Sequence, residues 1–216
     1  MNRIHNLGVV LIALSVVVAS CQKTTKRKLA NEWNVDFYQE EYHFVQSNTI
    51  NRETYENGQY SRVEISNGEE DTVFKGTVVS NTMTINTDGT WSSFIEYSAY
   101  NSNPNNPNPI VKVYKNTRSG TWNFAKGRKG DDFKKNELVY FNVTKLNYVD
   151  YKTTDPLDVD ESTVELAPGT LFETFRVIES KSKTLELKQE GYSQRYSNGD
   201  LELDRNSTFW YKLSKK

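Results

Sequence analysis

The feature that most constrains this fold is an Asp-Gly pair between two stretches of alternating apolar residues. Met83 and Ile85 come before the pair Asp88-Gly89, and Trp91 opens the alternating stretch after it. Successive side chains of a β-strand point to opposite faces of a sheet, so alternation places the apolar side chains on one face. Asp-Gly between two such runs is a strong signal for a tight turn. The sequence therefore predicts a β-hairpin here.

The same alternation recurs along most of the chain, with turn dipeptides at Asn57-Gly58, Asn67-Gly68 and Asn198-Gly199. Helix is expected to be scarce, because the helical period of about 3.6 residues is kept nowhere for long. A short helix is possible over residues 40–46. We therefore expect an all-β fold, an antiparallel meander closed into a barrel, with a β-sandwich as the alternative. The expected strands are residues 29–38, 60–66, 73–79, 82–86, 90–97, 110–114, 120–124, 138–149, 171–178, 184–189, 201–203 and 208–213.

Two segments interrupt the strand pattern. Residues 101–109 contain three Pro among Asn and Ser. Proline has no N–H to donate to a sheet, so a projecting loop is expected there. Residues 150–169 are acidic and polar, and a second loop is expected over them.

The first twenty residues have the pattern of a targeting signal. Arg3 lies in a short polar start, and an apolar run follows over residues 7–18. Twelve residues of helix span about 18 Å, well short of a bilayer core of ~30 Å. The run ends in Val18-Ala19-Ser20-Cys21, which resembles the lipobox of bacterial lipoproteins. The resemblance implies cleavage before Cys21, diacylglycerol on its sulfur and acylation of the new amino terminus by a fatty acid such as palmitate. An ordinary secretory signal with an incidental Cys is the alternative.

The residues after Cys21 bear on where such a lipoprotein would go. Residue 22 is Gln and no acidic residue follows before Lys28. Similarity to lipoprotein sorting rules implies the outer membrane, with the periplasm-facing side favoured over surface display. We therefore divide the chain into a signal helix and peptide (1–20), a cationic tether (21–28) and one β-domain (29–216), which is long enough to bury a core.

Several motifs together resemble the lipocalin-like lipoproteins that are frequent in Bacteroidota. The resemblance implies a barrel and a small hydrophobic or amphipathic ligand. The chain departs from true lipocalins in its first strand, where Asn31 stands in place of the Gly of Gly-x-Trp. The matching motifs, in chain order, are Leu-x-x-x-Trp at residues 29–33, an aliphatic residue before Asp-Gly-Thr at residues 85–90, Gly-Thr-Trp at residues 120–122, and Ile178 followed by Lys183, Leu185 and Leu187.

Composition excludes several kinds of chemistry. One Cys allows neither an intramolecular disulfide nor a multi-Cys zinc site. One of the two His lies in the signal peptide, which leaves His43 alone and gives no support for a catalytic triad. A formal net charge of −1 gives no electrostatic footprint for nucleic acid. We expect no enzyme activity, no cofactor and no metal.

The aromatic residues of the strands are the remaining candidates for a binding site. They predict either a ligand cavity or a filled core, and the filled core is the commoner outcome in a small barrel. The first hypothesis is a membrane-anchored binding module for a small hydrophobic or amphipathic ligand. The alternative is a structural or interaction lipoprotein of an envelope complex that has no small-molecule ligand. The candidate barrel-lining residues are Trp33, Trp91, Trp122, Phe124 and Tyr140.

Two charged clusters have a functional and a plain interpretation. The acids of residues 155–161 are possible calcium ligands, but their spacing is not that of an EF-hand, and a solvated loop is favoured. The cations of residues 126–135 are possible contacts for a polyanion or a lipid headgroup, but a charged hairpin loop is favoured. The residues concerned are Asp155, Asp158, Asp160 and Glu161 in the first cluster, and Lys126, Arg128, Lys129, Lys134 and Lys135, with Asp131 and Asp132, in the second.

Overall fold

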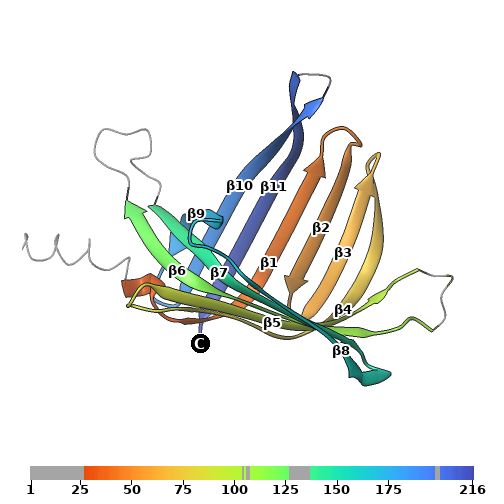
Figure 1. Cartoon of the computed structure of the whole chain (residues 1–216), viewed down its shortest axis with the longest axis horizontal. Coiled ribbons are helices and arrows are strands. Elements are labelled where there is room, and N and C mark those ends of the chain that lie inside the picture. The colour runs from red at the N-terminus through yellow and green to blue at the C-terminus, as the bar shows by residue number, and fades with distance from the viewer. Residues whose placement is uncertain (1–26, 104, 106–107, 127–136, 198–199) are drawn as a thin grey trace, which may run out of the picture.

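Eleven antiparallel strands make up nearly all of the computed structural model, which describes residues 27–103, 105, 108–126, 137–197 and 200–216 (Figure 1). Among these residues no helix is long and apolar enough to cross a bilayer. The strands are β1 (Glu32–Phe44), β2 (Thr49–Glu56), β3 (Gln59–Ser66), β4 (Glu69–Ile85), β5 (Thr90–Asn101), β6 (Lys112–Lys126), β7 (Glu137–Lys152), β8 (Asp155–Glu165), β9 (Leu171–Ser180), β10 (Thr184–Ser197) and β11 (Asp200–Lys215).

Ten of these strands close into one barrel. Each of β1 to β6 pairs with the next strand in sequence. β7 then pairs with β9, β9 with β10, β10 with β11, and β11 with β1, which closes the ring. The strand β8 lies outside this ring, and its one partner among the described strands is the second half of β7. The predicted all-β meander closed into a barrel is thus confirmed, and the sandwich is not formed.

The barrel is narrow at one end and wide at the other because β1 changes neighbours along its length. Residues 32–34 of β1 pair with residues 82–84 of β4, and from Phe37 onward β1 pairs with β2. The β2–β3 hairpin is therefore inserted only into the wide half, and the narrow end is an eight-stranded circuit that skips it. Figure 1 shows β10, β11, β1, β2 and β3 side by side in one wall, with β5, β6, β7 and β8 crossing below.

A bulge in β1 decides which of its side chains enter the barrel. The ladder with β11 pairs Val35 with Leu213 and Phe37 with Lys212, so Asp36 is an extra residue. Simple alternation predicts that Phe37 shares a face with Val35. The bulge instead turns Phe37 outward, where it contacts the Trp210 ring at 5.1 Å between centroids. As a consequence Tyr38 and the even-numbered residues that follow face the interior.

The predicted turns are present where the structure describes them. Asn57-Gly58 and Asn67-Gly68 join successive strands, and all four residues have positive φ, as a two-residue hairpin turn requires. The Asp88-Gly89 hairpin is also confirmed, with Gly89 at a φ of 93°. The Asp88 carboxylate accepts hydrogen bonds from the N–H and the hydroxyl of Thr90, which hold the pKa of Asp88 below its ordinary value. The turn at Asn198-Gly199 lies outside the described residues.

Two local predictions were wrong. Residues 40–46 do not form a helix, because β1 continues to Phe44 between two hydrogen-bonded neighbours, β2 and β11. Residues 150–169 are not a loop but contain the end of β7 and the whole of β8. The side chains of β8 are all exposed, so backbone hydrogen bonds to β7 hold this strand in place. Of the loop expected over residues 101–109, Asn101 is instead the last residue of β5, and the other described residues lie outside any strand; the next strand begins at Lys112.

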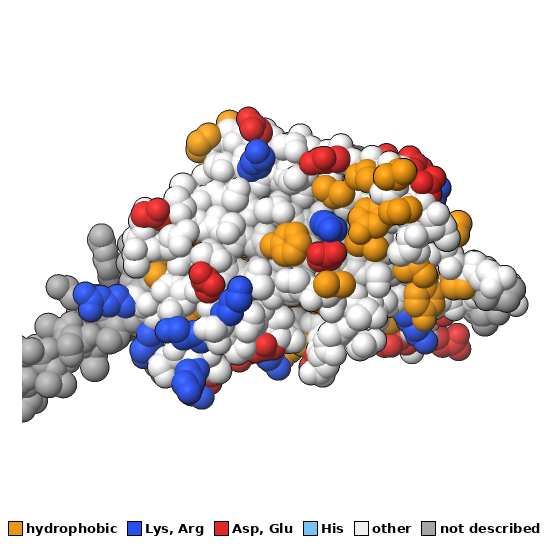
Figure 2. All heavy atoms as spheres, turned by 90° about the horizontal axis from the view of Figure 1, so that it is seen from below, with side chains coloured by type: hydrophobic (Ala, Val, Ile, Leu, Met, Phe, Trp, Pro, Cys, Tyr) orange, Lys and Arg blue, Asp and Glu red, His pale blue; other side chains and the backbone are white. Residues whose placement is uncertain are grey.

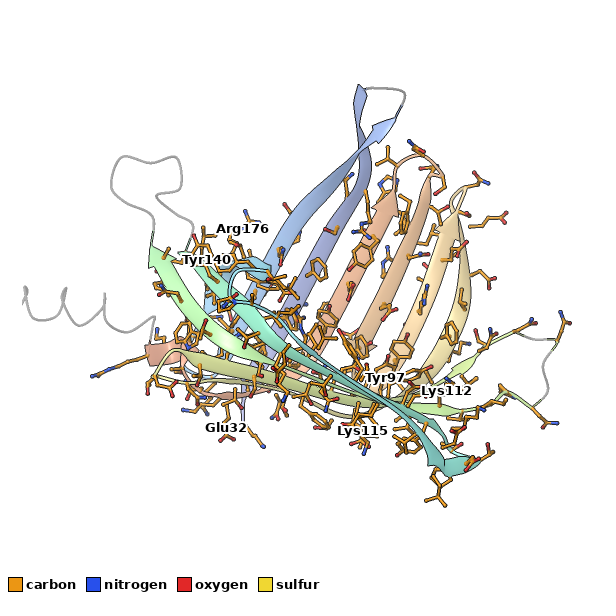
Figure 3. All side chains as sticks on the ribbon, in the orientation of Figure 1. Glu32, Tyr97, Lys112, Lys115, Tyr140 and Arg176 are labelled. Atoms are coloured by element: carbon orange, nitrogen blue, oxygen red, sulfur yellow. The ribbon has the colours of Figure 1, made fainter. Side chains whose placement is uncertain are left out.

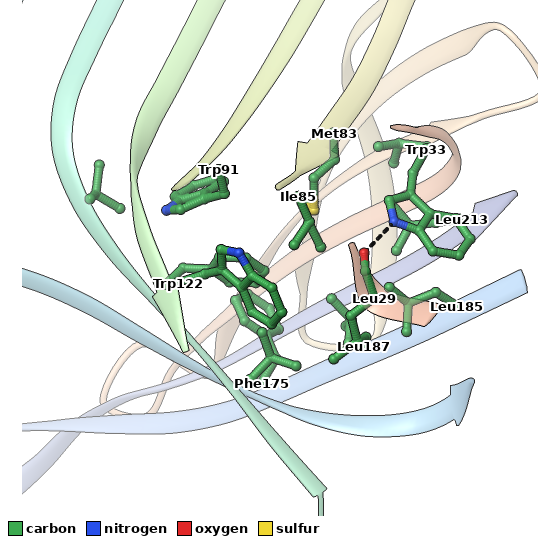
Figure 4. Close-up of a cluster of buried hydrophobic side chains, with 14 residues drawn as sticks. Leu29, Trp33, Met83, Ile85, Trp91, Trp122, Phe175, Leu185, Leu187 and Leu213 are labelled. Atoms are coloured by element: carbon green, nitrogen blue, oxygen red, sulfur yellow. Dashed lines mark hydrogen bonds between the residues drawn. The ribbon is translucent and has the colours of Figure 1, made fainter. Parts of the chain in front are cut away.

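The narrow end holds the main hydrophobic core (Figure 4). Trp33 is almost fully buried there, and its indole N–H donates to the Leu29 carbonyl at 2.9 Å. Gly120 lies opposite Trp91 in the β5–β6 ladder, and a Cβ on it would collide with the Asn142 carbonyl oxygen. The buried members of this core are Leu29, Trp33, Val35, Met83, Ile85, Trp91, Trp122, Val139, Phe141, Val143, Phe175, Leu185, Leu187 and Leu213.

Candidate functional site

The wide half of the barrel encloses a cavity of about 410 Å³. Its wall is built from β1, β2, β4, β5, β6, β7, β9 and β11. Volumes of this order, between about 300 and 1,000 Å³, are typical of small-molecule sites. The cavity is therefore the leading candidate for a binding site among the described residues.

A belt of tyrosines crosses the interior of the barrel, and four of its six members line this cavity. Six rings contact one another in series, with centroids 4.5 to 5.6 Å apart. Figure 3 shows Tyr97 of the belt pointing toward the wall of β1, β2 and β3. Rings at these distances contribute packing beyond their buried area, so the belt holds the two walls together. Its members are Tyr211, Tyr38, Tyr55, Tyr60, Tyr97 and Tyr114.

The belt exists because cross-strand register places tyrosines opposite one another. Tyr38 faces Tyr211 on one side and Tyr55 on the other, and Tyr55 in turn faces Tyr60. Burial is the main reason that the pKa of each belt hydroxyl lies above the ordinary tyrosine value, and the pKa of Tyr97 is raised to about 12. These hydroxyls remain protonated, and able to donate, throughout the neutral range.

An ion pair between β6 and β9, the two neighbours of β7 in the ring, lines one wall of the cavity. The Arg118 guanidinium bonds to the Glu173 carboxylate, and only 24% and 18% of the two side chains are exposed. Arg118 also lies 6.0 Å above the Trp91 ring. Burial alone would lower the pKa of Arg118, but the Glu173 carboxylate raises it above its ordinary value. The guanidinium is therefore permanently charged and already neutralised by its partner.

Two further carboxylates line the cavity on the opposite wall. Glu40 on β1 and Glu53 on β2 are direct partners in the antiparallel ladder. Glu40 accepts a hydrogen bond from the Tyr38 hydroxyl at 2.7 Å, and Glu53 accepts one from Tyr55 at 3.3 Å. Burial and the neighbouring Glu40 together raise the pKa of Glu53. Arg62 on β3 lies 3.9 Å from the other oxygen of Glu53.

The five aromatic residues predicted to line the barrel lie elsewhere than around this cavity. Trp33, Trp91 and Trp122 are buried in the core of the narrow end, and Phe124 packs against that core. Tyr140 is on the outer face, where its ring stacks on Phe172 at 5.5 Å between centroids. The filled-core alternative thus describes the narrow end, and a separate set of residues lines the cavity.

Sequence reasoning missed the cavity residues because their strands alternate polar and aromatic residues. In the sequence, Tyr38, Glu40 and Tyr42 look like part of a solvent-facing stretch, because the residues between them are Gln39 and Glu41. Only the bulge at Asp36 shows that these three face inward. The available signal was the number of tyrosines, because 13 tyrosines in one β-domain exceed what a solvated surface needs.

The other candidates that the structure describes lie apart from the cavity. His43 is near the end of β1, on the face opposite to Tyr42, and pairs with Asn206 of β11 in the ladder. The acids of residues 155–161 lie along β8, and no group of three or more potential metal ligands is found in the described part of the chain. Cys21 lies outside the described residues, as does the cationic segment apart from Lys126, the last residue of β6.

Comparisons with known proteins were made at the level of families, curated sequences and solved structures. No family, no curated protein and no solved structure matches this chain.

Proposed function

We propose that this protein is a membrane-anchored lipoprotein whose barrel binds a small amphipathic ligand in the cavity of its wide half. The observation that carries the proposal is the cavity itself, about 410 Å³ in volume and walled by aromatic and aliphatic side chains together with seven polar or charged ones. Sites for small molecules use apolar walls for affinity and polar groups for orientation, and a mixed wall of this kind suits an amphipathic ligand.

The proposed anchor is Cys21, which lies in the lipobox-like segment before the barrel. The chain would be delivered to the outer membrane and would face the periplasm, tethered by residues 21–28. Two acyl signals give stable anchoring where one does not. Globomycin treatment, or Cys21→Ala, should leave the signal peptide uncleaved, so that a larger precursor accumulates in the inner membrane and does not reach the outer membrane; unchanged processing and fractionation would contradict the anchor.

Ligand binding is tested by native mass spectrometry of the protein purified from its own host, followed by titration of the delipidated protein with the uncharged probe N-phenyl-1-naphthylamine. Ser93 lines the cavity on β5, and Ser92 beside it does not. Ser93→Phe should fill part of the cavity and lower the fluorescence of bound probe several-fold. Ser92→Phe is the matched control and should bind as the wild type does. A wild-type protein that carries no small molecule and binds no probe would overturn the proposal.

The second candidate function is an interaction role within an envelope complex, and β8 is the observation in its favour. All its residues are exposed, and its outer edge has no strand partner in the described part of the chain. Leu157 is 93% exposed and Val159 46%. Figure 2 shows apolar side chains gathered toward one end of the face seen from below. Exposed strand edges are sites of pairing with other chains.

This second candidate predicts a protein neighbour in intact cells. Crosslinking in whole cells should give one defined adduct, and Val159→Pro should remove it by taking away a backbone donor of the edge. The matched control is Val164→Thr, which leaves the backbone unchanged. Recovery of the monomer alone would count against an interaction role.

A further inference from the structure

The cavity wall carries more negative than positive charge. Three carboxylates line it, from Glu40, Glu53 and Glu173, against one guanidinium from Arg118, so the formal sum is 1 − 3 = −2. Because Arg118 is bonded to Glu173, that pair contributes no free charge. The charge that a ligand would meet therefore comes from Glu40 and Glu53.

These two carboxylates are opposed without full compensation. Like charges directly opposite each other in an antiparallel ladder are unfavourable. Tyrosine hydroxyls donate to each carboxylate, but a hydroxyl brings no positive charge. Two arginines lie near the pair. Arg62 is 3.9 Å from Glu53 with 41% of its side chain exposed, and the Arg205 guanidinium is 4.6 Å from the centre of the Tyr42 ring. Burial, and then the repulsion of Glu40, raise the pKa of Glu53 despite the attraction of Arg62.

Aromatic rings surround the same pair. Tyr38 and Tyr55 lie on the core side of the carboxylates, with ring centroids 5.6 Å apart. Phe209 is the ladder partner of Glu40 on β11, and its ring makes an edge-to-face contact with Tyr42 at 5.8 Å between centroids. The faces of aromatic rings attract cations, above all when water is excluded. Carboxylates and ring faces thus combine in one place.

A buried amide lies close to this pair. Asn51 faces Tyr42 in the β1–β2 ladder, and its Oδ1 has no hydrogen-bond partner in the described part of the protein. Asn51 does not itself line the cavity, so the acceptors that a ligand would meet on this side are the carboxylates of Glu40 and Glu53.

We propose that the ligand of this cavity is an organic cation, with an ammonium group held between Glu40 and Glu53 and an apolar body that lies against the tyrosine belt. This inference rests on the proposed function, because it names the chemical class of the ligand of the same site. A cation removes the repulsion between the carboxylates, and this gain is not available to an uncharged or an anionic ligand.

The test compares three probes with one alkyl chain and different head groups: an alkyltrimethylammonium, the alkanol and the alkyl sulfate, each below its micelle concentration. Isothermal titration calorimetry at neutral pH and low salt should give tightest binding for the trimethylammonium. Its Kd should be lower than that of the alkanol by about tenfold or more, and the alkyl sulfate should bind most weakly.

Charge-removing variants test whether the preference for the cation comes from Glu40 and Glu53 or from the overall charge of the protein. Glu40→Gln with Glu53→Gln should bring the Kd of the trimethylammonium to within about threefold of that of the alkanol, whose own Kd should barely change. Glu41→Gln is the matched control, since Glu41 lies beside Glu40 on the outer face, where it pairs with Arg52 at 2.7 Å. Glu40→Gln alone gives a second, milder variant if the double variant folds poorly.

The outcomes distinguish this inference from the proposal on which it rests. Equal binding of the trimethylammonium and the alkanol overturns the organic cation and keeps the binding function. Tighter binding of the alkyl sulfate also overturns it and assigns the head group to Arg118. If none of the three probes binds the wild type, both proposals fall.

Discussion

Glu40 and Glu53 face each other across the β1–β2 ladder, and both point into the cavity. Their position is unfavourable for the fold, because two like charges are held together in a half-buried site. Strain of this kind is retained in proteins mainly where a ligand relieves it. Removing one of these two charges should therefore stabilise the empty barrel and weaken the binding of a cationic ligand.

The first prediction is that Glu53→Gln stabilises the empty protein at neutral pH. The pKa of Glu53 is raised in the folded state, so the carboxyl favours folding below its unfolded pKa of about 4.3. That contribution is lost as the pH rises through the higher folded pKa. The free energy of unfolding of Glu53→Gln should thus exceed that of the wild type at pH ~7 by about 0.5–2 kcal/mol.

The same variant should lose its advantage at acid pH, where the wild-type carboxyl is protonated. Urea unfolding at pH ~7 and pH ~4 measures the difference between variant and wild type in each condition. The charged groups around Glu53 are Glu40 on β1 and Arg62 on β3, and Tyr55, Tyr60 and Tyr97 are the neighbouring hydroxyls. Glu41→Gln, on the outer face, should not stabilise at either pH. A Glu53→Gln protein that is less stable than the wild type at neutral pH would contradict the repulsion.

The second prediction concerns the alkaline limit of the fold. Seven tyrosines, the belt and Tyr42, have a raised pKa in the folded state, that of Tyr97 to about 12. A tyrosine whose pKa is higher in the folded than in the unfolded protein stabilises the fold at any pH below its unfolded pKa of about 10. That stabilisation is lost as the pH rises through the pKa of the folded state. The protein should therefore unfold between about pH 10 and 12 rather than ionise these hydroxyls in place.

This behaviour is visible in the absorbance of tyrosinate. The other tyrosines should ionise first, and the seven with a raised pKa should ionise later, in one step with the loss of the far-ultraviolet circular dichroism of the strands. In denaturant all 13 tyrosines should titrate together. A single ionisation step near pH ~10 with an intact fold would show that the belt is open to water.

The fold could be predicted from the sequence wherever the alternating apolar residues are also the residues that the barrel buries. At the narrow end they do, and the strands that carry Trp33, Trp91 and Trp122 were predicted as strands with their apolar faces inward. The Asn-Gly and Asp-Gly turns were predictable as well, since few other residues adopt positive φ without strain. Local chemistry alone was enough in these places.

The cavity was not predictable in this way, because it depends on relations between strands. The bulge at Asp36 shifts the faces of β1 by one residue, and nothing in the residues around it signals an insertion. The approach of Glu40 to Glu53 follows from the register of that strand with β2. The strand β8 was taken for a loop because its residues are all exposed, and only its pairing with β7 orders it.

The third prediction compares two leucines at opposite extremes of burial. Leu187 is fully buried in the core of the narrow end, and Leu157 on β8 is 93% exposed. Leu187→Ala leaves a cavity in a region that cannot collapse easily, and should lower the free energy of unfolding by about 2–5 kcal/mol. Leu157→Ala is the matched control and should change it by no more than about 0.5 kcal/mol. Guanidinium unfolding measures both, and equal effects would contradict the position of the core.

The fourth prediction concerns the ion pair of Arg118 and Glu173. Removing one partner leaves the other charge in a largely buried site, so Arg118→Met and Glu173→Leu should each lower the free energy of unfolding by about 2–4 kcal/mol. The double variant replaces both charges by apolar side chains of similar size. It should recover most of that loss, because a buried pair repays its own desolvation only in part.

A double-mutant cycle from urea unfolding measures this coupling, expected at about 1–3 kcal/mol. The pair Lys145–Glu165 is the matched control, with nitrogen and oxygen 4.0 Å apart and side chains 53% and 80% exposed. Solvent screens such a pair, so its coupling should be no more than about 0.5 kcal/mol. If the two cycles gave the same value, Arg118 would be solvated rather than held by Glu173, and it would be free to meet an anionic ligand in the cavity.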